Sequence, residues 1–312
     1  MKYSVVIPLY NKQKYIVSAL RSVLAQTFED FEIIVVDDGS QDDSLQMAMS
    51  VQDKKIRVLH QNNQGVAVAR NVGIENAEGE YISFLDADDT WEPNYLEKID
   101  EIVKKYPESD IFVTAYKIDL GEGKKNISRQ LPLKEGCLTS YWETLDNKYD
   151  FVWTSATTVR KKALINAGLF CPGEKIGQDL DMWARVARNN PRVAYTSNIC
   201  VTYNRKAESN ARTRVKIAWA RAFIHDLEEE LNDKGHSQKE LVAIQKKYDS
   251  KMTVYIFTCI MANEKKRAKQ ALKHWKGNCT LRNVVLRIGL CIAGLMPVSV
   301  NRFLYQVRLN VF

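Results

Sequence analysis

Three carboxylates follow a short apolar run in the first third of the chain. Residues 81–85 have the composition of a buried strand, and Asp86, Asp88 and Asp89 come next. Asp86 and Asp88 are two residues apart, so on an extended chain their side chains point the same way. Such carboxylates repel unless a cation lies between them, and Mg²⁺ and Mn²⁺ prefer oxygen ligands. The spacing indicates a metal–phosphate site. The alternative is a solvated acidic turn in which Asp89 or Thr90 caps the next helix.

The first 90 residues alternate between runs rich in Val and Ile and segments with apolar residues at helical spacing. This alternation predicts a parallel sheet whose strands are joined by right-handed crossovers. Pro8 has no N–H to donate, so we expect the first strand to end there, and we expect Asn11 to cap the first helix. The expected strands are 3–9, 31–36, 56–59 and 81–85, and the expected helices are 15–24 and 66–74.

A second acidic pair, Asp37 and Asp38, follows the expected strand at 31–36. The carboxyl ends of parallel strands lie on the same edge of a sheet, where ligands of open α/β folds bind. We therefore expect the pair to flank one ligand site together with Asp86 and Asp88. A polar ligand that bears phosphate and a metal ion fits four carboxylates at one edge.

Four segments, taken in order and spacing, resemble the family 2 glycosyltransferases. The resemblance is strong over residues 1–120 and continues weakly to about 205. It implies a GT-A type α/β fold, a Rossmann-like mixed and mainly parallel sheet flanked by helices, here with a C-terminal helical extension. The segments are SVVIPLYN at 4–11, VVDDGS at 35–40, ARNVG at 69–73 and FLDADD at 84–89.

The resemblance implies a nucleotide site at the ends of the first two strands. Pro8 and Tyr10 would line the pocket for the nucleobase. Asp38 would hydrogen-bond the base, usually uracil, and Asp37 would lie beside it. Without the resemblance, Pro8 and Tyr10 are explained by strand termination and core packing.

The resemblance also implies which residues would bind the sugar-diphosphate part of the donor and the metal ion. Arg70 would approach the donor, and Asn71 would shape the same wall, whereas the simple alternative for Arg70 is a surface cation on a helix. Asp86 and Asp88 would form the acidic motif, with Asp88 ahead of Asp86 as the direct ligand of Mn²⁺ or Mg²⁺.

The segment GQDLDMW at 177–183 resembles the family pattern Gly-Glu-Asp-x-Asp-Leu-Trp. The resemblance makes Asp179 the general base toward an acceptor hydroxyl, and Gln178 departs from the usual Glu. The alternative is helix capping, for which Asp181 is the better candidate. Strands are expected at 110–116, 151–159 and 192–203, a loop or hairpin at 121–129, and a helix at 160–167 that ends at Gly168.

The charge of the chain is unevenly distributed. The net charge is +7, but residues 205–312 hold 21 Lys and Arg against 9 Asp and Glu, which suggests an anionic partner. Helices are expected at 217–231 and 239–261. The stretch 284–296 is apolar but shorter than the about 20 residues that span a bilayer. It suits a helix at a membrane interface, or one docked on the protein.

The spacing of the cysteines and histidines bears on the redox environment of the protein and on whether it binds zinc. The six cysteines form no C-x-x-C pair, which is typical of reduced thiols, and the four scattered histidines indicate no zinc site. The chain runs from Met1 into a strand without an apolar leader. We therefore expect a cytoplasmic protein, peripheral at the inner face of the plasma membrane.

The leading hypothesis is an inverting, metal-dependent glycosyltransferase that moves a sugar from a UDP-sugar to a glycan or lipid-linked glycan in surface polysaccharide synthesis. We expect a catalytic domain at 1–205, divided into a nucleotide-sugar half (1–120) and an acceptor half (121–205), and a helical region at 206–312. We expect no nucleic-acid partner, and a homodimer is an open alternative. One competing hypothesis is a catalytically impaired nucleotide-sugar-binding or scaffolding protein. A phospho-receiver domain fits poorly, because Tyr10-Asn11 stands where its acidic pair belongs.

Overall fold

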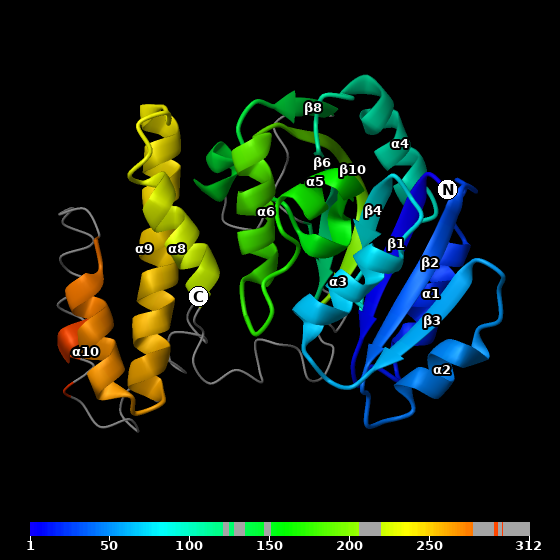
Figure 1. The fold of residues 1–312 in the computed structure, drawn as a ribbon, viewed down its shortest axis with the longest axis horizontal. Helices are drawn as coiled ribbons and strands as arrows, with labels where there is room; N and C mark the ends of the chain where they lie inside the picture. The colour runs from blue at the N-terminus through cyan, green and yellow to red at the C-terminus, as the bar shows by residue number, and fades with distance from the viewer. Residues whose placement is uncertain are drawn as a thin grey trace. The chain divides into compact units, whose positions relative to one another are not determined.

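A computed structural model describes residues 1–120, 125–127, 135–146, 151–205, 220–276, 290–292 and 295 (Figure 1). The chain divides into two compact units. The first comprises Met1–Glu174 with Gln178–Glu208, and the second comprises Lys175–Gly177 with Ser209–Phe312.

A mixed, mainly parallel sheet runs through the first unit, which confirms the predicted fold class. Its strand order is β3-β2-β1-β4-β9-β6-β10-β5, with β7 paired to β6 and β8 paired to β10. Its first four strands are parallel and supply the expected β-α-β crossovers. They are β1 (Tyr3–Leu9), β2 (Phe31–Asp38), β3 (Ile56–Gln61) and β4 (Tyr81–Phe84), joined through helices α1 (Ile16–Leu24), α2 (Ser44–Ser50) and α3 (Val66–Asn76).

Helices cover both faces of this half of the sheet (Figure 1). Alternate β1 residues such as Val5 and Ile7 pack in the core that α1 and α4 (Tyr95–Lys105) help to build. On the opposite face, α3 approaches β1 so closely that a Cβ at Gly73 would meet a methyl carbon of Val6 at 2.4 Å. Glycine at this position therefore permits the close helix–sheet packing.

The strand β1 covers the whole expected run 3–9, but it does not end at Pro8 as the missing N–H led us to expect. It runs to Leu9, and Pro8 lies opposite Val36 of β2. The pairing of β1 with β4 stops at Val6, so at Pro8 the strand has a neighbour on one side only. A missing N–H costs little where no second ladder needs it.

The rest of the sheet comes from the middle of the chain. Strand β9 (Thr157–Arg160) pairs antiparallel with both β4 and β6, and β10 (Val193–Asn204) runs parallel to β6 (Ile111–Asp119). The strand expected at 151–159 was therefore partly wrong: a 3₁₀ turn, η2 (Thr154–Ala156), precedes β9. The remaining elements are β5 (Thr90–Trp91), β7 (Lys125–Ile127), β8 (Glu135–Leu138), η1 (Trp142–Asp146), α5 (Lys161–Asn166) and α6 (Gln178–Asn189).

Asn11 does not cap the first helix, so that expectation was wrong. Helix α1 begins at Ile16 with no side-chain cap. Asn11 instead adopts a left-handed backbone (φ 52°), and its Oδ1 accepts a hydrogen bond from the Gln41 backbone N at 2.8 Å. Short polar side chains tolerate this conformation in turns. The contact ties the loop after β1 to the loop after β2.

Between residues 220 and 276 the second unit contains the helices α8 (Arg221–Glu230), α9 (Gln238–Met261) and α10 (Lys265–His274), and the described residues 290–292 and 295 are also helical. Ser237 and Glu240 start α9 with a reciprocal capping box. No helix in the described ranges combines the length and the apolar character that crossing a membrane requires. The interfacial helix predicted at 284–296 lies mostly outside the described residues.

Candidate functional site

The carboxyl ends of β1, β2 and β4 bring the predicted acidic residues to one edge of the sheet. Asp37 and Asp38 end β2, and Asp86 follows β4 after one residue. Strand β1 lies between β2 and β4, so its following loop separates the two acidic groups. That loop contributes Lys12, which is not among the predicted site residues.

Each carboxylate of the acidic motif is paired with a cation of the same chain. Arg70 of α3 donates from Nη2 to Asp86 Oδ1 at 2.7 Å, and Lys12 Nζ lies 2.6 Å from Asp88 Oδ2. Arg70 is 3% exposed, and its Nε and Nη1 have no hydrogen-bond partner among the described residues. The surface-cation alternative for Arg70 is therefore wrong. Buried guanidinium groups with orphaned N–H donors are costly unless a ligand accepts from them.

The acidic motif has the donor chemistry that a divalent cation needs. The Asp86 side chain keeps 30% of its exposure and that of Asp88 15%. Each pairs with its cation through one oxygen, which leaves the second oxygen available to a metal ion. Burial raises the pKa of Asp88, Lys12 opposes that rise, and Asp86 adds to it. A bound cation would offset the cost of burying the Asp88 charge and would reduce its repulsion with Asp86.

Asp89 is a buried junction. It is 1% exposed; Ser155 Oγ donates to its Oδ2 at 2.5 Å, and the Asn204 backbone N donates to its Oδ1 at 2.9 Å. Burial, reinforced by Asp88 and Asp86, holds the pKa of Asp89 well above its usual range. The solvated acidic turn is therefore not what forms, and Asp89 joins the motif to η2 and to the end of β10.

The proposed base is connected to the acidic motif through two consecutive hydroxyl residues. Thr154 Oγ1 donates to Asp179 Oδ2 at 3.0 Å. Ser155 donates to Asp89 and accepts from the Asp86 backbone N at 3.1 Å. Neighbouring Cα atoms are about 3.8 Å apart, so this two-residue bridge holds Asp179 beside the end of β4.

Gln178 and Asp181, the polar residues on either side of Asp179 in the segment 177–183, are both buried, but only Asp181 has a charged partner. Gln178 is 9% exposed, and its Oε1 is buried without a hydrogen-bond partner among the described residues. Asp181 is buried inside α6 and forms an ion pair with Arg185 Nη2 at 2.6 Å, so it is not the helix cap that we considered. Asp179 is half-buried in the first turn of α6.

The predicted nucleotide side consists of turns fixed by carboxylates. Asp38 accepts hydrogen bonds from the Gln64 and Gly65 backbone N atoms, both at 2.8 Å, and from Gln61 Nε2 at 2.7 Å. Asp37 lies 2.7 Å from His60 Nδ1. Pro8, near the end of β1, and Tyr10, just after it, are both half-buried. Asp38 thus fixes the loop that precedes α3. This loop lies next to the position that we assign to the nucleobase.

Asn71 holds the opposite wall in place. Its Nδ2 donates to the Phe170 carbonyl at 2.8 Å, and its Oδ1 accepts from the Phe170 backbone N at 2.9 Å. The Phe170 ring lies 5.4 Å from the Arg70 guanidinium carbon. Asn71 therefore shapes the surroundings of Arg70 through Phe170.

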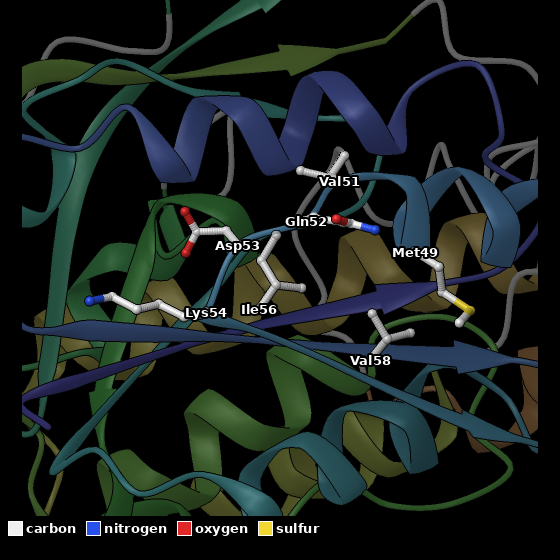
Figure 2. Close-up of a pocket in the computed structure, with 7 residues that line it drawn as sticks. All are labelled: Met49, Val51, Gln52, Asp53, Lys54, Ile56 and Val58. Atoms are coloured by element: carbon white, nitrogen blue, oxygen red, sulfur yellow. The ribbon is translucent and has the colours of Figure 1, made fainter.

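A hollow of about 620 Å³ lies elsewhere, beside the edge strand β3 (Figure 2). Residues before and within the first half of β3 line it, so it lies toward the amino end of this strand. None of the predicted site residues contributes to it. Its lining residues are Met49, Val51, Gln52, Asp53, Lys54, Ile56 and Val58.

The order and directions of the strands in this sheet are those of the GT-A type fold. The structure of S. aureus TarS in complex with UDP-GlcNAc superposes with a TM-score of 0.69 at 21% identity, over 97% of this chain and 90% of that chain. This likeness confirms the fold.

The model of the family "Glycosyl transferase family 2" matches residues 4–167. The glycosyltransferase GlyG of Streptococcus pneumoniae serotype 4 is 30% identical over 241 residues, which are 74% of this chain and 79% of GlyG. An uncharacterized glycosyltransferase of Rickettsia conorii is 46% identical over 116 residues, which are 37% of this chain and 18% of that protein. The chain belongs to glycosyltransferase family 2.

Proposed function

We propose that this glycosyltransferase transfers a sugar, with inversion, from a UDP-sugar to a hydroxyl of a glycan or lipid-linked glycan during surface polysaccharide synthesis. One observation carries the proposal. The Thr154–Ser155 bridge ties Asp179 to the loop of the acidic motif. Because one turn contacts both the base and the acidic motif, it can hold them in the fixed relative positions that favour a single in-line displacement.

The chain's own residues divide the chemistry between them. Asp179 accepts the proton of the acceptor hydroxyl as that oxygen attacks the anomeric carbon and the nucleoside diphosphate leaves from the opposite side. Arg70 Nε and Nη1, which have no hydrogen-bond partner among the described residues, supply donors for the departing diphosphate, and Phe170 shields that guanidinium from water. Thr154 orients the carboxylate of Asp179 toward the acceptor side.

We include a divalent cation, Mn²⁺ or Mg²⁺, in the proposal. Asp88 and Asp86 would hold it, because their carboxylates are the partly exposed oxygen ligands at the end of β4. The ion would neutralise charge that grows on the leaving diphosphate.

The nature of the donor rests on similarity. TarS has been solved with UDP-GlcNAc and with UDP. The half-buried Pro8 and Tyr10 and the loop held by Asp38 are the features that we assign to the uracil of a UDP-sugar.

We further propose that the protein acts at the inner face of the plasma membrane. Helix α10 contains no Asp or Glu. Its exposed lysines, followed by the exposed Lys276, support contact with anionic lipid. A lipid-linked acceptor would be presented at such a surface. The lysines of α10 that are exposed are Lys265, Lys266, Lys269 and Lys273.

The Asp179→Asn variant tests the function. UDP release from UDP-sugars would be measured with glycan and lipid-linked acceptors present, and UDP affinity by calorimetry. We expect turnover to fall about 10²- to 10⁴-fold while UDP affinity changes little, because the base acts on the acceptor in the transition state.

The matched control is Asp30→Asn, which makes the same chemical change at an exposed residue at the amino end of β2. It should turn over like the wild-type protein. Wild-type protein that binds UDP but releases none from any UDP-sugar would favour the catalytically impaired binding protein. The motivating observation is Gln178, whose buried Oε1 has no hydrogen-bond partner among the described residues.

A further inference from the structure

Lys12 forms a partly buried ion pair with the carboxylate assigned to the metal. Its Nζ lies 2.6 Å from Asp88 Oδ2, and the two side chains are 11% and 15% exposed. The residues are 76 positions apart in the chain. Surface lysine pairs usually contribute little, but this ammonium lies between strand ends, where water is largely excluded.

The backbone around Lys12 is held so that its side chain is directed into the site. The Lys12 backbone N donates to Ser44 Oγ at 2.6 Å, and Ser44 is fully buried at the start of α2. The preceding Asn11 has φ 52° and accepts from the Gln41 backbone N. These two contacts therefore fix the backbone at Lys12. The four-carbon side chain still leaves the ammonium able to move.

The ammonium leaves the second oxygen of Asp88 to a metal ion, but its positive charge disfavours binding of that ion. A divalent cation coordinated by that carboxylate would lie close to a second positive charge, and both would use oxygens of the same group. A nucleoside diphosphate adds phosphate oxygens, which offer the ammonium another partner. The charges in the site therefore fit two arrangements, one without and one with the metal–diphosphate ligand.

We propose that Lys12 is an exchangeable counter-ion: it holds Asp88 while the site lacks a metal ion, and moves to a phosphate oxygen of the nucleoside diphosphate when the divalent cation binds. This inference rests on the proposed function, because it needs a metal ion at Asp88. Lys12 is then a positioning residue with two opposite effects. It weakens binding of the metal alone and strengthens binding of the nucleotide in the presence of metal.

The experiment compares full-length wild-type protein with Lys12→Met, Lys12→Arg and the control Lys14→Met, an exposed lysine in the same loop. Binding of Mn²⁺ alone is followed by electron paramagnetic resonance of the free ion, and binding of UDP at saturating Mn²⁺ by calorimetry. For Lys12→Met we expect Mn²⁺ affinity to rise and UDP affinity to fall, each by roughly tenfold, a typical coupling between two bound groups. Lys12→Arg keeps the charge and should resemble wild type, as should Lys14→Met.

Opposite changes in the two affinities distinguish exchange from a structural role, since a damaged site would lose affinity for both ligands. On an Asp88→Asn background, Lys12→Met should no longer change Mn²⁺ binding. If wild-type protein binds Mn²⁺ and Lys12→Met binds it equally or more weakly, the exchange is overturned and the metal site stands. If wild-type protein binds UDP identically with and without Mn²⁺ and takes up no Mn²⁺, the proposed metal site fails and the exchange fails with it.

Discussion

Replacing Ser155 by alanine removes one hydroxyl that serves two buried groups. Ser155 is fully buried, its Oγ donates to Asp89 Oδ2 at 2.5 Å, and it accepts from the Asp86 backbone N at 3.1 Å. The substitution leaves a small space and adds no clash. It therefore measures how much the junction between η2 and the acidic motif contributes to folding.

The magnitude follows from the two groups that lose their partner. A buried polar group left unsatisfied costs about 1–3 kcal/mol. Asp89 keeps its bond from the Asn204 backbone N, and the Asp86 N–H loses the acceptor that Ser155 supplied. We expect the free energy of unfolding to fall by about 2–5 kcal/mol at neutral pH, which is a large part of the about 5–15 kcal/mol typical of a domain.

The loss of stability in Ser155→Ala should depend on pH, because the Ser155 hydroxyl affects the pKa of Asp89. Burial raises the pKa of Asp89 in the folded protein, and the Ser155 hydrogen bond lowers it. A carboxyl with a raised folded pKa is favourable below its unfolded pKa, and that contribution is lost as pH rises through the folded pKa. Removing the hydroxyl raises the folded pKa further. This part of the loss should be absent below about pH 4 and should grow toward neutral pH.

Urea unfolding followed by tryptophan fluorescence checks this expectation, since Trp91 Nε1 donates to the Ser155 carbonyl at 2.7 Å. The control is Ser50→Ala, an exposed serine whose hydroxyl bonds only within α2 to the Met47 carbonyl. It should lie within about 0.5 kcal/mol of wild type. A Ser155→Ala protein as stable as that control, with no dependence on pH, would refute the reasoning.

Two further outcomes are expected. Asp88→Asn should abolish the dependence of UDP affinity on Mn²⁺ in calorimetry while the thermal transition is kept; equal affinities with and without metal in wild type would contradict the assignment. Changing Lys265, Lys266 and Lys269 to Glu should reduce flotation with anionic vesicles, at roughly 1 kcal/mol per basic residue; full-length protein that never binds such vesicles at low salt would end the membrane proposal.

The parallel half of the sheet could be predicted because its signals are local. The run that begins at Phe31 is buried throughout, and the expected strand was right, although it continues to Asp38. The helix expected at 66–74 exists and extends to Asn76. In both cases the residues that set the periodicity lie within one element, so composition alone identified them.

The contacts that assemble the site could not be predicted, because they join distant segments through single side chains. Nothing in the local pattern pairs Lys12 with Asp88 or Ser155 with Asp89. The consecutive hydroxyl residues around Thr154 were a visible signal, but a run of such residues also suits a strand, and we expected one there. Burial of Asp89 likewise depends on the arrival of β10 from more than 100 residues further along the chain.

The position of β9 limits how the protein can be recombined with its relatives. This strand comes from residues 157–160, yet it fills the gap between β4 and β6 and pairs antiparallel with both. A fragment that ended before it would also lack β10, so β4 would lose its neighbour β9 and β6 would lose both β9 and β10. Unpaired strand edges of this kind favour aggregation. Chimeras that exchange acceptor specificity should therefore keep β9 with its native sheet partners and graft only segments that lie outside these ladders.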